Sequence, residues 1–355
     1  MTSWIDGTML VKPVKMGYSN ARVKAMKALL LQKRDIEAIA DAKDIEEVFS
    51  LLEKTSYRQD LVSGALAEKT LADQIEIACT KNFSRTLRKI LKLSPPDSRA
   101  SIMSVFEKYE IENIKLLLTS KHLKQAKEKT ASLVLETGIL PKGAMNRLVA
   151  AKDVREALAS LEGTPYASAI EKNAAKYEGD ITLLLSSLDE YYYKKMQGLA
   201  RQFPGEERVM LRMLKSVIDA KNISVILRAK KENISNAKIF RFIAAEGNIT
   251  KDKIRVAIGA KNIEECLKIF EKQFGLTSAI QEFQKTGSLI PVEIAIEKSI
   301  AKRGLHVLRR SVLSVSAIAG FLLLKEEEVN NIRKIIRAKE FNLPMEKLRE
   351  MLVIV

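Results

Sequence analysis

Three stretches of the chain repeat one another: NIKLLLTSK at residues 113–121, NISVILRAK at 222–230 and NIRKIIRAK at 331–339. Each begins with Asn-Ile and ends in Lys, and the starting positions 113, 222 and 331 are evenly spaced. Apolar residues stand at i, i+3 and i+4 from each isoleucine, which is the spacing of one buried face of an amphipathic helix. The pattern therefore predicts the same helix three times. The shared asparagine can bond a neighbouring loop and the lysine suits a helix C-terminus, so we interpret both as structural residues.

A second set of landmarks keeps the same spacing, here called the repeat interval. The segments AKDIEE, AKDVRE and AKNIEE begin at Ala42, Ala151 and Ala260, again one repeat interval apart. Each contains a capping-box pair, in which an Asp or Asn bonds free backbone N–H groups at a helix start and a Glu three residues later reaches back. The pairs are Asp44 with Glu47, Asp153 with Glu156, and Asn262 with Glu265. Several landmarks at one interval predict a triplicated module.

Two further features follow the repeat in part. Tyr57 and Tyr166 end the related segments TSY and TPY, whereas the third copy has Gly275 at that position. Pro95-Pro96 and Pro204-Gly205, whose first prolines are also one repeat interval apart, predict turns between helices.

Composition predicts an all-α fold. The 355 residues include only 15 Gly, 8 Pro and 6% aromatics, and no convincing strand alternation is present. We expect five or six helices in each unit of about 109 residues, and units of that size can each bury a core. This favours pseudo-threefold packing as a ring or funnel, although an extended arrangement fits the sequence as well. The predicted divisions are an N-terminal leader (1–18), three helical repeats (19–127, 128–236 and 237–345) and a C-terminal tail (346–355).

Charge and cysteine usage exclude several protein classes. The 60 Lys and Arg against 44 Asp and Glu give a net charge of +16, which favours an acidic partner such as nucleic acid, lipid headgroups or an acidic protein surface. Two cysteines and two histidines are too few for a disulfide framework or a zinc cluster. The N-terminus lacks a signal-peptide pattern, and the longest apolar stretch, 312–324, is shorter than the roughly 20 residues of a membrane span. We expect a soluble, cytoplasmic protein.

No catalytic or cofactor-binding residues are predicted. Phosphate-binding loops, zinc-protease motifs and nucleophile elbows are absent from the sequence, and the carboxylates form no compact acid–base group. Cys266 takes the repeat position of Val48 and Ala157, so we expect it, like Cys79, to be a core residue. His306 takes a polar helix position. We expect neither a cofactor nor a metal.

A basic pair recurs in every copy. Its two members are seven residues apart, hence two turns along one helix face, and they lie away from the apolar positions of that helix. The six residues, here called the basic ridges, are Arg85 and Lys92, Lys194 and Arg201, and Arg303 and Arg310. An ordinary solvated face explains them as well as the alternative, which is a set of positive charges facing an acidic or repeated partner.

The chain resembles a known family in three places. These are YSNARVKAMKALLL at 18–31, the repeated L-E-x-T-x-Y segments, and NNIRKIIRAKEFNLPMEKL at 330–348. Together they are similar to the C subunit of archaeal A-type ATP synthases and to its counterpart, the d subunit of the vacuolar H+-ATPase. The likeness covers essentially the whole chain, including its triplication.

The resemblance implies a non-catalytic rotor part with no small-molecule substrate. Members of the family are funnels of three similar helical domains around a pseudo-threefold axis. The resemblance implies a peripheral protein at the cytoplasmic face of the cell membrane, between the proteolipid (c-type) ring and the central stalk subunits of the D and F type, with contact to lipid headgroups. The basic ridges are then candidates for docking on the ring.

Two other classes stay open from the residues alone. One is a basic helical adaptor for nucleic acid, against which stand the scarcity of aromatics and the absence of a nucleic-acid motif. The other is an enzyme with an unrecognised helical site.

Overall fold

The fold is helical throughout the part of the chain that the computed structural model describes, which is residues 8–62, 70–174, 177, 180–202, 207–243, 246–311 and 315–355. Within those ranges the regular elements are α-helices and one short 3-10 helix, with no strand. The prediction of an all-α fold is confirmed. Within the same ranges, no helix combines the length and the apolar character that crossing a membrane requires.

The helices follow one order three times after a first helix, α1 (Thr8–Lys27). The first set is α2 (Lys33–Asp41), α3 (Ile45–Leu52), α4 (Arg58–Val62), α5 (Leu71–Leu93), η1 (Pro96–Ser98), α6 (Arg99–His122) and α7 (Lys127–Ala131). The second set is α8 (Lys142–Ala150), α9 (Val154–Ala159), α10 (Pro165–Ala174), α11 (Thr182–Gln202), α12 (Glu207–Lys231) and α13 (Asn236–Phe242). The third set is α14 (Lys251–Gly259), α15 (Ile263–Phe274), α16 (Thr277–Thr286), α17 (Ile290–Arg310), α18 (Val315–Glu340) and α19 (Met345–Met351).

Helix bounds reproduce the repeat interval seen in the sequence. The helices α6, α12 and α18 end at His122, Lys231 and Glu340, which are spaced by that same interval. Each is followed, two residues later, by a non-glycine residue with positive φ: Lys124, Asn233 and Asn342. A left-handed residue just past a helix end is a common way to satisfy its last carbonyl groups. The module is therefore repeated in backbone geometry as well as in sequence.

The predicted helix caps are confirmed. Asp44 Oδ1 accepts a hydrogen bond from the Glu47 backbone N–H at 2.9 Å, and Asp153 and Asn262 do the same in α9 and α15. The hydrogen bond accepted by the glutamate side chain differs from that of a capping box. The Glu47 carboxylate accepts the N–H of Lys43, one residue before the cap, at 2.7 Å, and the other two copies repeat this contact. Such caps each stabilise a helix by about 1 kcal/mol.

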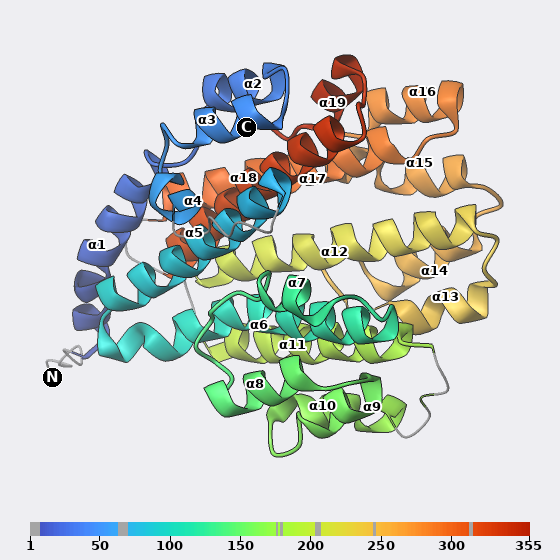
Figure 1. The fold of residues 1–355 in the computed structure, drawn as a ribbon. Helices are drawn as coiled ribbons and strands as arrows, with labels where there is room; N and C mark the ends of the chain where they lie inside the picture. The colour runs from blue at the N-terminus through green and yellow to red at the C-terminus, as the bar shows by residue number, and fades with distance from the viewer. Residues whose placement is uncertain are drawn as a thin grey trace, which may run out of the picture.

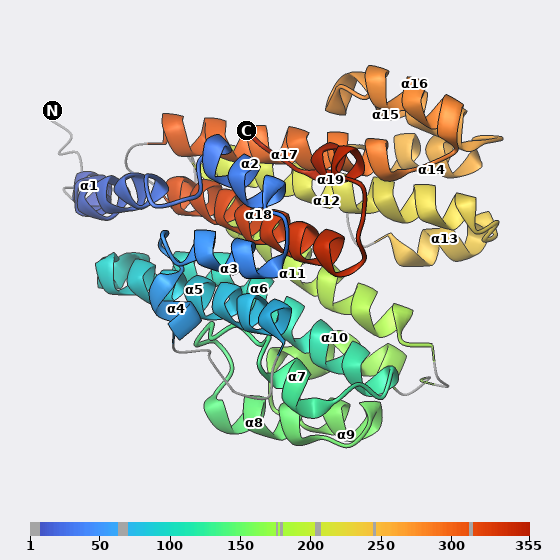
Figure 2. The ribbon, with the colours of Figure 1, turned by 45° about the horizontal axis from the view of Figure 1, so that its top comes forward.

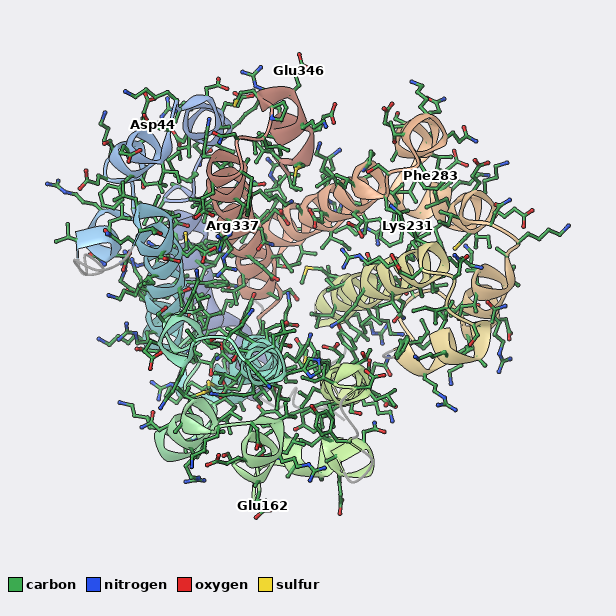
Figure 3. The ribbon with its side chains drawn as sticks, turned by 45° about the vertical axis from the view of Figure 1, so that its right-hand side comes forward. Asp44, Glu162, Lys231, Phe283, Arg337 and Glu346 are labelled. Carbon is green, nitrogen blue, oxygen red and sulfur yellow. The ribbon has the colours of Figure 1, made fainter. Side chains whose placement is uncertain are left out.

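Long and short helices occupy different parts of the molecule. The long helices α5, α6, α11, α12, α17 and α18 run through the middle, and short helices lie outside them (Figure 1). In Figure 3 the last turns of α12 and α18, marked by Lys231 and Arg337, lie toward the middle of the view. Asp44 and Glu162, which precede or follow short helices, lie at its edge.

Packing links each copy to the next one. The helix α6 packs on α8, α9 and α11 of the second copy, and α12 packs on α15 and α17 of the third. The helix α18 packs on α2, α3 and α5, so the last copy covers the first. Figures 1 and 2 show α18 beside these N-terminal helices in both views. Helices on either side of the predicted divisions at residues 127, 236 and 345 pack on one another. The packing therefore does not mark where one domain ends, and the domain boundaries stay a prediction.

The long helices pair as hairpins, and the ends of α5, α11 and α17 lie on the side of the molecule where α1 lies (Figure 1). η1 makes the turn between α5 and α6, as Pro95-Pro96 predicted. Pro204-Gly205 lies outside the described residues. The α17–α18 hairpin is held by two glycines. A Cβ on Gly320 would lie 2.7 Å from the Gly304 carbonyl oxygen and 2.9 Å from the Leu308 nitrogen, both of which are backbone atoms.

We expect Gly320→Ala to destabilise the protein, because its methyl group would force the α17 and α18 backbones apart. Overpacking of this kind costs about 1–3 kcal/mol. The matched control is Gly198→Ala in α11, where a Cβ would meet nothing within 4 Å. That variant should gain up to about 1 kcal/mol from helix propensity. Urea unfolding followed by circular dichroism measures both, and equal stability of the two variants would contradict the glycine contact.

Candidate partner-binding surface

The first member of each basic ridge makes internal contacts. Arg85 donates to Asp60 Oδ2 at 2.6 Å and to the Ser56 carbonyl at 3.0 Å. Arg303 donates to Ser216 Oγ at 2.5 Å and to a backbone carbonyl of α15 at 2.6 Å. Lys194 is exposed and forms an ion pair within its own helix, to Glu190 at 2.6 Å. Arg85 and Arg303 therefore also stabilise the fold.

The second member of each ridge lies at a hairpin turn. Lys92 and Arg310 are exposed in the last turns of α5 and α17. Arg201 belongs to α11, but its side chain lies outside the described residues. Lys92 and Arg310 therefore belong to helix ends that lie on the same side of the molecule (Figure 1).

The repeated Asn-Ile…Lys residues bind the chain's own loops, as the structural interpretation predicted. Asn113 donates to the Leu135 carbonyl and accepts from its N–H, and Asn331 makes the same two bonds to Val353. The lysines donate to carbonyls at the ends of the short helices. Lys121 bonds Val149, Lys230 bonds Ile258 and Ala260, and Lys339 bonds Ala42.

A set of buried carboxylates was not predicted from the sequence. Glu110, Asp219 and Glu328 lie on α6, α12 and α18, the second long helix of each hairpin. They are one repeat interval apart, and all are buried. Each accepts the backbone N–H of a residue that precedes a short helix. The bonds are Leu140 N–H to Glu110 at 2.8 Å, Ile249 N–H to Asp219 at 3.1 Å, and Leu31 N–H to Glu328 at 2.5 Å. Their common spacing in the sequence could have pointed to them. They were missed because carboxylates are usually exposed.

Tyr57 completes the site around Glu328. Its hydroxyl donates to Glu328 Oε1 at 2.6 Å and accepts from Lys325 Nζ at 2.9 Å, and Lys325 also pairs with Glu328 at 2.5 Å. Burial, followed by the negative charge of Glu328, raises the pKa of Tyr57 well above its usual value. Tyr166 is equally buried but lies 3.4 Å from Glu107 Oε1. The repeated tyrosine thus joins a short-helix segment to a long helix.

A second charged group lies among α6, α17 and α18. Lys108 pairs with Glu326 at 2.5 Å, and Lys334 pairs with Glu297 at 2.7 Å. Glu327 Oε1 lies 3.9 Å from Lys334 Nζ and has no hydrogen-bond donor among the described residues. Burial raises the pKa of Glu327 to about 7, which Lys334 opposes and Glu297 and Glu326 reinforce.

The cysteines are core residues, as predicted. Both are free and buried, and burial raises the pKa of Cys79 to about 12 and that of Cys266 to about 11. Thiols with such values stay protonated and unreactive. His306 is exposed on α17. Within the described ranges, no group of three His, Cys, Asp or Glu side chains could bind a metal ion.

The arrangement of helices, caps and buried bonds extends over nearly the whole chain, and so does its similarity to known proteins. The family model for the ATP synthase (C/AC39) subunit matches residues 19–351. The chain belongs to this family. Its role is accordingly that of an ATP synthase subunit.

Relatives from several archaea support the same assignment. The chain is 28% identical to the A-type ATP synthase C subunit of Methanocaldococcus jannaschii, with 99% of this chain and 89% of the relative aligned. It is 27% identical to the C subunit of Pyrococcus abyssi, over 98% of this chain and 94% of the relative. It is 25% identical to that of Thermoplasma acidophilum, over 94% and 97%. The resemblance to the C subunit that the sequence motifs indicated is confirmed.

We expect Tyr57→Phe to lower the free energy of unfolding by about 1–3 kcal/mol, because it leaves buried charged groups with one hydrogen-bond partner fewer. Tyr166→Phe is the matched control and should cost less, since its hydroxyl lies 3.4 Å from the nearest carboxylate oxygen. Denaturant unfolding of both variants tests the difference, and a larger loss for Tyr166→Phe would contradict it.

We expect Glu327→Gln to stabilise the protein at high pH only. The pKa of Glu327 rises on folding, from its usual 4.5 to about 7, so the folded state binds more protons than the unfolded chain between these values. Its destabilising effect therefore grows as pH rises through that window and is complete above it. Melting temperatures should favour the variant at about pH 8 and converge with wild type at about pH 4. An equal difference at both values would show that charge is not the cause.

Proposed function

We propose that this chain is a non-catalytic rotor part of an A-type ATP synthase. In this role it links the central stalk, with its D- and F-type subunits, to the membrane proteolipid ring and transmits torque between them. The observation that carries the proposal is the match to the family over residues 19–351, which leaves little of the chain for another activity. The place of action is the cytoplasmic face of the membrane, where the protein is peripheral.

The packing of the helices supports this mechanical role. An element that transmits torque must resist deformation. Here each copy is bonded to the next by a buried carboxylate, and α18 adds the third such bond back to the first copy. We further propose that the three copies form a funnel about a pseudo-threefold axis. The constant spacing of the helix ends and the packing of the last copy on the first both favour such an arrangement.

The basic ridges are proposed to face the ring or the lipid headgroups around it. Lys92, Lys194 and Arg310 are exposed, whereas Arg85 and Arg303 make the internal contacts described above. Individual exposed charge pairs contribute only about 0–1 kcal/mol, but several together steer association and make it depend on salt.

We expect the triple variant Lys92→Glu, Lys194→Glu, Arg310→Glu to bind the membrane ring roughly tenfold more weakly than wild type, with the loss largest at low salt. The control Lys142→Glu, Arg155→Glu, Lys268→Glu makes the same change of charge at exposed positions of the outer helices α8, α9 and α15. Co-sedimentation with membranes that contain the ring measures binding, and melting curves check the fold. Equal binding by the two variants would mean that the ridges are ordinary solvated faces.

A further inference from the structure

A basic groove of about 520 Å³ lies between α12 and α17. Five of its lining side chains are basic: Arg212, Lys302, Arg303, His306 and Arg310. Three serines add hydroxyl groups and a few apolar side chains complete the lining, and none of the described lining residues is a carboxylate. Its size falls within the range of small-molecule sites.

The two helices run in opposite directions along the groove. Arg303 of α17 bonds Ser216 of α12, while Arg228, further along α12, pairs with Glu293 near the start of α17. On α17 the residues Ser299, Arg303, His306 and Arg310 are spaced i, i+4, i+7 and i+11, so they follow one face over about 16 Å. The two arginines of this face, Arg303 and Arg310, lie two turns apart and therefore form a row that does not converge on a single point.

Arg303 is held in place without a carboxylate. Its guanidinium bonds the Ser216 hydroxyl and the Gln273 carbonyl and lies 5.3 Å from the centre of the Phe274 ring. Burial lowers the pKa of Arg303, and the negative charge of Asp219 opposes this shift. Arg212, Lys302 and Arg310 are exposed and form no ion pair with any described residue.

The opposite end of the same helix pair is different. There Arg228 pairs with Glu293 at 2.6 Å, and Lys334 of the adjacent α18 pairs with Glu297 at 2.7 Å. The hydrogen bond that Arg228 donates to Glu293 raises the pKa of Arg228. Basic residues at that end of the α12–α17 helix pair are thus paired with the protein's own carboxylates, whereas those lining the groove are not.

The equivalent helix pair of the preceding copy, α6 and α11, contains an internal ion pair. The residue one repeat interval before Ser216 is Glu107, which lies on α6 and pairs with Lys195 of α11 at 2.7 Å. At the equivalent position, Ser216 faces Arg303 with a neutral hydroxyl. Gly304 takes the position of Lys195, and the neighbouring Arg303 contacts Ser216, so the α12–α17 pair has a cation here but not the carboxylate of the α6–α11 pair.

We propose that this groove binds an anion with several phosphoryl groups, either free in solution or presented as a phospholipid headgroup. Arginine guanidinium groups match phosphate oxygens in pairs, and serine hydroxyls donate to the same oxygens. A row of cations suits successive phosphoryl groups better than one small anion. Phe, Tyr and Trp are absent from the described lining residues, which gives a nucleobase little to stack on. This inference does not depend on the proposed rotor role.

Binding of tripolyphosphate to the full chain, measured by isothermal titration calorimetry, tests the free-anion source. Co-sedimentation with cardiolipin vesicles, whose headgroup carries two phosphates, compared with phosphatidylcholine vesicles, tests the headgroup source. Ser216→Glu places a carboxylate against Arg303, as Glu107 already does against Lys195. A second variant, Lys302→Gln with Arg310→Gln, changes exposed residues only. The matched control, Arg228→Gln, removes one positive charge at the neutralised end. Sulfate at equal ionic strength controls for screening.

We expect wild type and Arg228→Gln to bind tripolyphosphate, cardiolipin vesicles or both, and the two groove variants to bind about tenfold more weakly or worse. Loss in calorimetry alone assigns a free anion, and loss in the vesicle arm alone assigns a headgroup. If Ser216→Glu fails to fold by circular dichroism, the Lys302→Gln, Arg310→Gln variant decides. Absence of wild-type binding in both arms, or equal losses in the groove variants and Arg228→Gln, would overturn the proposal.

Discussion

A buried carboxylate on the second long helix of each hairpin (α6, α12 and α18) fixes the position of one short helix. Glu110, Asp219 and Glu328 each accept a backbone N–H from the segment leading into a short helix. An ionised group in a protein interior is costly unless hydrogen bonds compensate it, so the segment must stay where it supplies them. The lysine eleven residues further along each long helix then bonds the far end of the same short helix. Each short helix is thereby attached to a long one at both ends.

The third of these attachments differs from the others in chain separation. Glu110 and Asp219 bond segments 30 residues further along the chain, whereas Glu328 and Leu31 are 297 residues apart. The same interaction that joins neighbours in the first two cases joins the two ends of the repeat in the third. A linear array of copies thus has three equivalent connections, and the third places α18 of the last copy against the first copy.

Much of the local structure could be predicted from the sequence, because caps and apolar stripes are local patterns. The bond from Asp44 to Glu47 and the loop contacts of Asn113 are examples. Tertiary partners could not be predicted, since periodicity shows which face is buried but not what covers it. Arg85 and Arg303 share a repeat position, yet one pairs with a carboxylate and the other with a serine. Comparison of the copies in chain order likewise does not predict that α18 packs on α2.

The hydrogen bond that the Leu31 N–H donates to Glu328 also sets an order of events during synthesis. Leu31 leaves the ribosome early, but its partner follows only after 297 more residues, which at usual rates of translation takes on the order of tens of seconds. During that interval the hydrogen bonds to Glu110 and Asp219 can form, while the first copy exposes the apolar faces that α18 will cover. The N-terminal helices are therefore the last to reach their final packing. A nascent chain that stops before α18 keeps that surface exposed, which makes it a substrate for chaperones or proteases and keeps it out of any assembly.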